Sequence, residues 1–161
     1  MAFVLQDPFL FEGTIRDNIR YGRLDASDAA IEQAAKQANA HQFIEKLEGG
    51  YDHVLTEDGG DISQGQKQLL SIARALVADP AILLLDEATS SIDTVTEMAI
   101  QEALDRLMKG RTSIVIAHRL NTVKNADFIF VLEHGKLLEG GPREELFASK
   151  GRYYDMVMQG K

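Results

Sequence analysis

Residues 82–93 read Ile-Leu-Leu-Leu-Asp-Glu-Ala-Thr-Ser-Ser-Ile-Asp. An apolar run ends abruptly there in two adjacent carboxylates, Asp86 and Glu87. A buried strand that delivers acids to its carboxyl end is typical of α/β proteins that hold a metal ion and a water beside a phosphate. Taken alone, the stretch also fits a core strand followed by a solvated turn, so the rest of the chain decides between the two interpretations.

Strands and helices alternate around this stretch. Such alternation predicts a parallel sheet with crossover helices, and therefore an α/β fold. The short apolar segment 2–5 is a further strand candidate. The predicted strands of the alternating part are 81–85, 113–117 and 128–132, and its predicted helices are 64–77 and 94–108.

The part of the chain before this alternation reads as a small helical lobe. Thr14 and Ser27 are predicted to cap two short helices. A further helical stretch, 41–47, ends at two glycines. Beyond the last predicted strand, residues 133–136 look like a hairpin turn, Pro142 starts another helix, and a terminal helix follows.

Composition bounds the function classes. The 161 residues are the size of one domain, with 45% hydrophobic content and a net charge of −8. An acidic chain lacks the basic footprint of a nucleic-acid-binding protein, so no nucleic acid partner is expected. No apolar run approaches the roughly 18 residues of a membrane span, and the start does not read as a signal peptide. The absence of cysteine excludes disulfides and thiolate metal sites.

A second motif precedes the acidic strand. Residues 62–68 read Ile-Ser-Gln-Gly-Gln-Lys-Gln, in which Ser63 and Gln66 form a capping box ahead of an apolar-faced helix. The start of a helix carries unpaired N–H groups and a partial positive charge, so it attracts phosphate. Gly65 would let the backbone approach such an anion closely. By itself, this motif also fits a capped structural helix.

These two motifs, followed by Ile-Val-Ile-Ala-His at 114–118, together resemble the nucleotide-binding domain of ATP-binding-cassette (ABC) transporters. The resemblance runs from about residue 3 to the end, and the order of the motifs makes it specific. It implies a partial P-loop NTPase (ABC ATPase) fold over 1–161, with a parallel sheet core. A helical lobe with the signature helix would span 14–78, and the C-terminal part of the core 79–161.

The resemblance also implies roles around the acidic strand. Asp86 would hold Mg²⁺ through water, and Glu87 would act as the general base on the attacking water. His118 resembles the switch histidine of the family, which contacts the γ-phosphate. Without that resemblance, a single histidine at the end of a strand would be interpreted as a structural hydrogen-bonding residue. Asp93 resembles the D-loop residue that touches the partner cassette, and it would also serve as a helix N-cap.

The motif at residues 63–66 resembles the ABC signature, which contacts the γ-phosphate of ATP held by the opposite cassette. Its members here are Ser63, Gln64, Gly65 and Gln66. Two residues depart from the family pattern, because Ile62 replaces Leu and Gln64 replaces the first Gly of the pair.

The N-terminal segment is similar to the exporter branch of the family. Gln6 resembles the glutamine-loop residue, which reaches the metal and water and links the site to the transmembrane partner. The apolar residues 9–11 fit either a core or a docking groove. Glu57 occupies the place of the exporters' coupling loop. The histidines at 41, 53 and 134 match no motif and are interpreted as surface residues.

No G-x-x-x-x-G-K-[ST] phosphate loop occurs in these residues. The chain therefore looks like the later part of a cassette, from the glutamine loop onward. The resemblance implies ATP and Mg²⁺ as cofactors, a second cassette and a transmembrane domain as partners, and a place at the cytoplasmic face of a membrane. We expect part of an exporter ATPase that is inactive by itself. The alternative is a non-catalytic module that docks on a full cassette or membrane partner.

Overall fold

The structure is a computed structural model that describes residues 1–56, 60–87, 92–117 and 122–159. The chain divides into two compact units, Met1–Ile116 and Ala117–Lys161. Each unit is described by itself.

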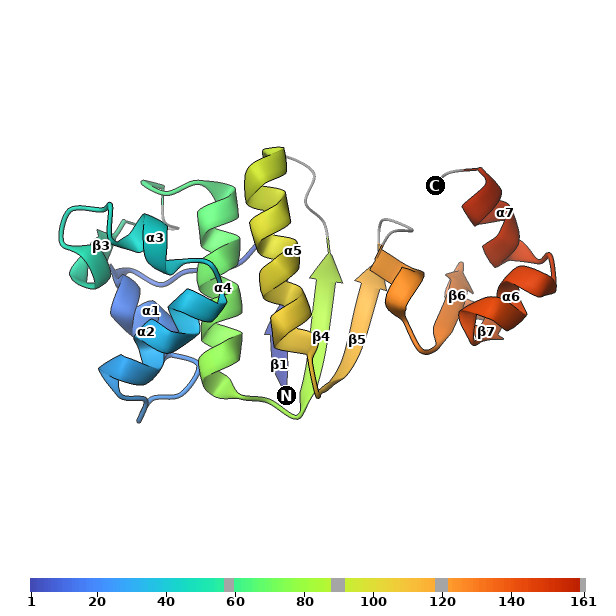
Figure 1. The fold of residues 1–161 in the computed structure, drawn as a ribbon, viewed down its shortest axis with the longest axis horizontal. Helices are drawn as coiled ribbons and strands as arrows, with labels where there is room; N and C mark the ends of the chain where they lie inside the picture. Colours follow the sequence, from blue (N-terminus) through green and yellow to red (C-terminus); the bar gives the residue numbers. More distant parts are fainter. Residues whose placement is uncertain (57–59, 88–91, 118–121, 160–161) are drawn as a thin grey trace. The chain divides into compact units, whose positions relative to one another are not determined.

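The first unit contains a three-stranded sheet. Its order is β1-β4-β5, so the strand at the start of the chain lies beside a strand that follows much later. The β1–β4 pair is parallel, with Val4 opposite Leu85. In Figure 1 the arrows of β4 and β5 also point the same way. The bounds are β1 Ala2–Val4, β4 Ile82–Glu87 and β5 Thr112–Ala117.

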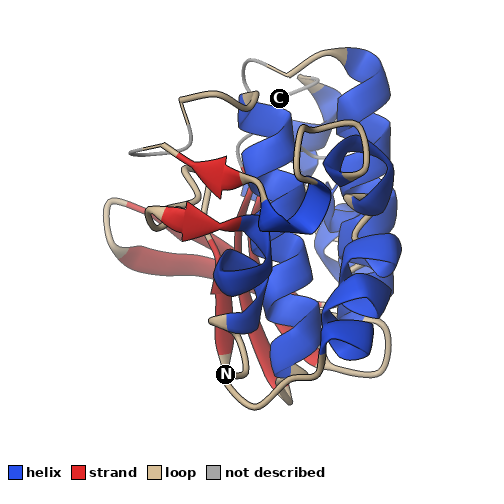
Figure 2. Ribbon diagram, turned by 90° about the vertical axis from the view of Figure 1, so that its left-hand side faces the viewer, coloured by secondary structure: helices blue, strands red, loops and turns tan. Residues whose placement is uncertain are grey.

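Two long helices, α4 and α5, cover one face of this sheet (Figures 1 and 2). Strand side chains alternate between faces, so Val4, Leu83 and Leu85 point toward the helices and are at most 3% exposed. The buried helix residues Leu70, Ile72, Ile100 and Leu107 belong to the same apolar core. The helices span Gln64–Ala78 (α4) and Thr94–Met108 (α5).

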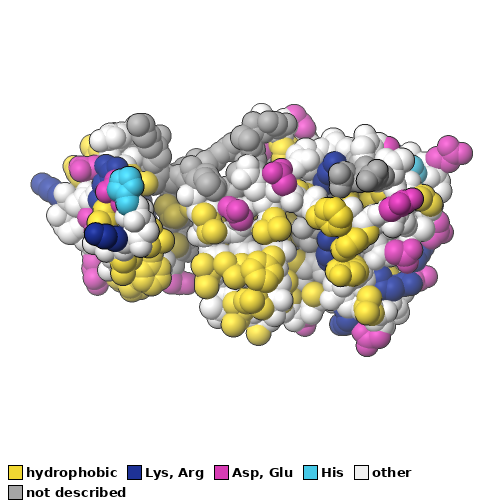
Figure 3. All heavy atoms as spheres, turned by 180° about the vertical axis from the view of Figure 1, so that it is seen from behind, with side chains coloured by type: hydrophobic (Ala, Val, Ile, Leu, Met, Phe, Trp, Pro, Cys, Tyr) yellow, Lys and Arg dark blue, Asp and Glu magenta, His cyan; other side chains and the backbone are white. Residues whose placement is uncertain are grey.

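The opposite face of the sheet is apolar and open. Phe3, Ile82, Ile114 and Ile116 are each between 43% and 55% exposed. Figure 3 shows hydrophobic side chains gathered over these strands. Parallel sheets normally carry cover on both faces, and here the described helices of the unit cover one.

Short helices pack against the outer side of α4. The caps of the first two are as predicted: the Thr14 side chain accepts from Asp17 N–H, and the Ser27 side chain accepts from Ala30 N–H. A two-residue ladder, β2 with β3, was not predicted. These elements are α1 Ile15–Arg20, α2 Asp28–Gln37, α3 His41–Ile44, the 3-10 helix Gly50–Asp52, β2 Gly13–Thr14 and β3 Val54–Leu55.

The second unit is a hairpin covered by two helices. β6 and β7 are antiparallel, and the turn between them places His134 and Gly135 at positive φ. The small core consists of Ile129, Val131, Leu146 and Tyr153. The elements are the 3-10 helix Thr122–Asn125, β6 Ile129–Glu133, β7 Lys136–Gly141, α6 Arg143–Ala148 and α7 Arg152–Met158.

The α/β fold predicted from the sequence is confirmed, and the predicted long helices and strands lie within a few residues of the observed ones. Two details differ. Within the described residues β6 pairs with β7 and not with the three-stranded sheet. Pro142 precedes helix α6 as its N-cap residue instead of lying in its first turn.

Candidate functional site

The carboxyl edge of the sheet gathers three of the predicted site residues. Val4 is opposite Leu85, so the chain leaves β1 toward Gln6 beside the point where β4 reaches Asp86. Gln6 is exposed and Asp86 is half-buried. Glu87 is the last residue of β4, and its side chain lies outside the described residues. The parallel strands thus bring Gln6 and Asp86, which are 80 positions apart in the sequence, to one edge of the sheet.

The donor set at this edge fits Mg²⁺. Carboxylate and amide oxygens are the protein ligands that this ion prefers, and it usually keeps several waters and bonds to one or two carboxylates plus substrate phosphates. Within the described residues, no three acidic or histidine side chains cluster as a metal cage. A magnesium ion at Asp86 would therefore depend on phosphate and water oxygens for the rest of its shell.

The predicted capping box at the start of α4 is present. The Ser63 hydroxyl accepts from the Gln66 N–H (3.2 Å), and the Gln66 side-chain oxygen accepts from the Ser63 N–H (2.9 Å). Both acceptors are thus engaged inside the box. Within the described part of the chain, neither the Ser63 hydroxyl nor the Gln66 side-chain amide donates a hydrogen bond. Two donors therefore remain at a helix N-terminus, which is a donor set that fits an anion.

Gly65 has a packing role that the sequence did not indicate. A Cβ built on Gly65 would lie 2.3 Å from Thr96 Cγ2 and 3.3 Å from Ile92 Cγ2. Gly65 is buried where the start of α4 meets the start of α5. Glycine at this position is thus required for the approach of the two helices, beside any approach to a ligand.

Gln64, which stands where the family pattern has glycine, makes a contact that glycine could not make. Its amide nitrogen donates to Asp7 Oδ1 at 3.2 Å. Asp7 follows Gln6, so this bond joins the start of α4 to the segment that leaves β1. The sequence does not mark Asp7 as a site residue, because an exposed Asp beside a proline is common in loops.

Asp93 caps α5, as the sequence allowed. Its carboxylate accepts from the Thr96 N–H at 3.0 Å, and this backbone hydrogen bond lowers the pKa of Asp93. Its predicted contact with a partner cassette stays a prediction. His118 and Glu57, two other predicted contacts, lie outside the described residues.

Two of the histidines interpreted as surface residues are partly buried and paired. His41 Nδ1 lies 2.8 Å from the Tyr51 hydroxyl, and burial raises the pKa of Tyr51 to about 12. His53 lies between Asp61 Oδ2 at 2.6 Å and the Glu48 carbonyl at 2.9 Å. His134 is exposed, as expected.

The His53 site predicts a pH-dependent stability. Both ring nitrogens face oxygen acceptors, so both must donate, which only the imidazolium form does. The hydrogen bond to Asp61 raises the pKa of His53, and the same bond lowers the pKa of Asp61. The raised His53 pKa gives stability that is complete below about pH 6.5 and is lost as pH rises through the folded value. The lowered Asp61 pKa gives stability above about pH 3.9 that is lost as pH falls.

His53→Gln should therefore lower the free energy of unfolding by up to about 1 kcal/mol between about pH 5 and 6, and the effect should shrink as pH rises through the raised pKa of His53. Denaturant unfolding followed by circular dichroism at several pH values measures this difference. His134→Asn is the matched control, because it removes an exposed histidine from the hairpin turn of the second unit and leaves the His53–Asp61 pair in place. A His53→Gln effect that grows as pH rises would contradict the assignment.

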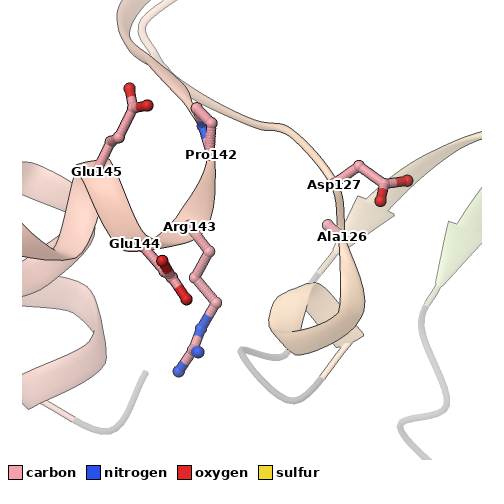
Figure 4. A pocket seen from close by; sticks show the side chains of 6 residues that line it. All are labelled: Ala126, Asp127, Pro142, Arg143, Glu144 and Glu145. Atoms are coloured by element: carbon pink, nitrogen blue, oxygen red, sulfur yellow. The ribbon is translucent and has the colours of Figure 1, made fainter.

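A hollow of about 320 Å³ lies in the second unit (Figure 4). It is lined by Ala126, Asp127, Pro142, Arg143, Glu144 and Glu145. Of the predicted site residues that lie in the described part of the chain, none lines this hollow.

Within the described ranges, every helix is too short or insufficiently apolar to cross a membrane.

Comparison with known proteins shows the family. The ABC transporter family matches residues 1–90. An uncharacterized ABC transporter ATP-binding protein, YfiC of Bacillus subtilis (strain 168), is 67% identical over 97% of this chain and 26% of its own length. An ATP-dependent lipid A-core flippase of Syntrophus aciditrophicus (strain SB) is 53% identical over 97% of this chain and 26% of its own.

The solved structures give the same result. A bacterial Atm1-family ABC exporter with ATP bound is 44% identical, with a TM-score of 0.86, over 98% of this chain and 28% of that one. The chain thus spans about a quarter of the length of the relatives named here. It belongs to the ABC transporter family, within the exporter-type ATP-binding domains.

Proposed function

We propose that these residues work in an ABC exporter as part of a cassette that binds and hydrolyses ATP, and that this hydrolysis powers transport across a membrane. The observation that supports this most is the start of α4. There the capping box engages its own acceptors and leaves the Ser63 hydroxyl and the Gln66 amide as donors. A helix N-terminus with two such donors suits a phosphate presented by a second cassette.

The acidic edge supplies the other half of the proposed site. Asp86 and Gln6 would hold the magnesium ion, which when bound neutralises charge on the phosphates of ATP. Glu87 would take a proton from the attacking water. His118 would contact the γ-phosphate and help to orient Glu87. Ser63, Gln64, Gly65 and Gln66, together with Asp93, would face the nucleotide and the partner cassette.

The proposed partners follow from the same proposal, that these residues are part of an exporter cassette. A second cassette, identical or different, would complete the nucleotide site, and a transmembrane domain would contact the segment after β1. The cassette would lie at the cytoplasmic face of the membrane. The division into a helical lobe with the signature helix at 14–78 and the C-terminal part of the core at 79–161 stays a prediction about domain organisation.

A non-catalytic interaction module is the second candidate. This candidate requires that these residues act without a G-x-x-x-x-G-K-[ST] loop, which does not occur among the 161 residues. A complete transporter carrying these residues that hydrolyses ATP in a Glu87-dependent way would exclude it.

Ser63→Ala tests the proposed site against a purely structural role. Loss of the cap should destabilise the protein by about 1 kcal/mol. Ser27→Ala is the matched control, since Ser27 caps α2 with a similar bond of 3.3 Å. Both variants should show similar losses in denaturant unfolding. Only Ser63→Ala should also raise the ATP concentration that the complete transporter needs for half-maximal hydrolysis. Equal behaviour of the two variants in hydrolysis would restrict Ser63 to capping.

A further inference from the structure

A partly buried arginine on the outer side of α4 holds the segment that follows β1. The Arg74 side chain makes three hydrogen bonds through three different nitrogens. Nε donates to the Asn18 carbonyl at 2.8 Å, Nη1 to the Phe9 carbonyl at 2.9 Å, and Nη2 to Asn18 Oδ1 at 3.1 Å. These acceptors are all uncharged, and burial lowers the pKa of Arg74. The guanidinium of Arg74 therefore holds the backbone at Phe9 and Asn18, together with the Asn18 side chain.

Asn18 extends this grip along the segment. It is 2% exposed, and its side-chain oxygen accepts from the Phe11 N–H at 2.8 Å. Its amide donates to the Phe11 carbonyl at 2.9 Å and to the Thr14 carbonyl at 3.1 Å. Arg74 and Asn18 thus bind backbone groups of residues 9, 11 and 14. A loop held by this many polar contacts has little freedom to move away from α4.

Aromatic rings close over the guanidinium. Arg74 lies 5.4 Å from the centre of the Phe11 ring and 5.7 Å from that of Tyr21, which are themselves 4.4 Å apart. Such contacts favour a planar cation and shield its hydrogen bonds from water. Gly22 allows the end of α1 to come this close, because a Cβ there would lie 2.1 Å from the Arg74 carbonyl oxygen.

A second bond ties the same segment to the other end of α4. Gln64, in the first turn, donates to Asp7 as described above. The segment 7–13 is therefore attached to α4 near both ends of the helix. One attachment adjoins the signature residues at 63–66, and the other lies beneath the exposed rings of Phe11 and Tyr21.

We propose that Arg74 is a positioning residue that fixes the segment 7–13 to α4, so that this segment and the start of α4 move as one piece. A displacement of the segment then reaches Ser63 without passing through the sheet. The consequence for nucleotide binding rests on the proposed function, whereas the clamp itself does not.

Hydrogen exchange of backbone amides tests the clamp directly. In Arg74→Lys the single ammonium cannot reproduce three bonds in a fixed fork, so the Phe11 amide and its neighbours at 9–13 should exchange about ten-fold faster or more. Amides in the middle of α4 should keep their protection. Arg106→Lys is the matched control, because Arg106 also donates to a backbone carbonyl, that of Gln37, and to an asparagine oxygen, that of Asn39. It should leave the exchange at 9–13 unchanged.

Nucleotide tests the coupling in the complete transporter. In the unaltered protein, ATP should slow exchange both at 63–66 and at 9–13. Arg74→Lys combined with Asp7→Ala, which removes the acceptor of the Gln64 bond, should keep the response at 63–66 and lose most of that at 9–13. Retention of both responses would overturn the proposal, and so would unaltered basal exchange at 9–13. Loss of protection throughout the first unit would show a general structural role instead, and would overturn it too. If ATP has no effect on the unaltered protein, the proposed function fails, while the basal comparison still decides the clamp.

Discussion

Replacing Glu87 by Gln in the complete transporter is expected to lower the rate of ATP hydrolysis by roughly 10²–10⁴-fold, the usual contribution of a positioned general base. The change keeps size and hydrogen bonding but removes the group that accepts the proton. Glu87 closes β4 at the edge where Asp86 and Gln6 also lie. ATP should still bind, because Asp86 and the signature residues are unaltered, and the paired cassettes should stay closed.

Single-turnover hydrolysis, measured beside nucleotide binding, separates these effects. Glu133→Gln is the matched control, since Glu133 is also the last residue of a strand, β6, and pairs with Arg152 at 3.1 Å. It should hydrolyse ATP at the parental rate. Asp86→Asn should instead weaken the dependence on Mg²⁺. Hydrolysis by Glu87→Gln at near the parental rate would exclude Glu87 as the base.

The 161-residue chain, produced by itself, is expected to bind Mg-ATP with a dissociation constant weaker than about 1 mM and to show no hydrolysis. The reason is chemical. The α4 terminus and the Asp86 edge supply contacts to a terminal phosphate and a metal ion, but the backbone N–H cradle and lysine of a phosphate loop do not occur in these residues. The donors at Ser63 would act on nucleotide that another cassette holds.

Isothermal calorimetry of the chain with Mg-ATP measures this affinity. The control is the same chain joined to the upstream part of a related cassette that carries a phosphate loop, which should bind about a thousand-fold more tightly. A micromolar dissociation constant for the 161 residues alone would show that the nucleotide site has been misplaced.

Local chemistry made much of this fold predictable. The Ser63–Gln66 capping box, the Thr14 and Ser27 caps and the apolar run ending at Asp86 each follow from side chains within a few residues of one another. The sequence order of these motifs was enough to indicate the family. The resemblance to the family implied that Gln6 and Asp86 share one metal site, and the parallel pairing of β1 with β4 brings the chain at both residues to one edge of the sheet.

Contacts between distant segments were not predictable in the same way. The β2–β3 ladder pairs residues 13–14 with residues 54–55, which are far apart in the sequence. Each strand has two residues and is therefore too short to give an alternating pattern. Arg74 reads in sequence as the solvated side of an amphipathic helix, and only the packing of α1 turns it inward. The steric role of Gly65 depends on where α5 crosses α4.

The open face of the β1-β4-β5 sheet affects how the stability of this protein should be understood. Covering a half-exposed Phe or Ile side chain removes enough apolar surface to contribute about 1 kcal/mol, so four of them contribute about 4 kcal/mol. A small domain has only about 5–15 kcal/mol in total. A contact that covers this face would therefore add an amount of free energy comparable to a large fraction of the total. Because such a contact is a binding equilibrium, the added stability depends on the concentration of whatever covers the face. A melting temperature measured on these residues is then a property of the solution and its concentration as much as of the chain.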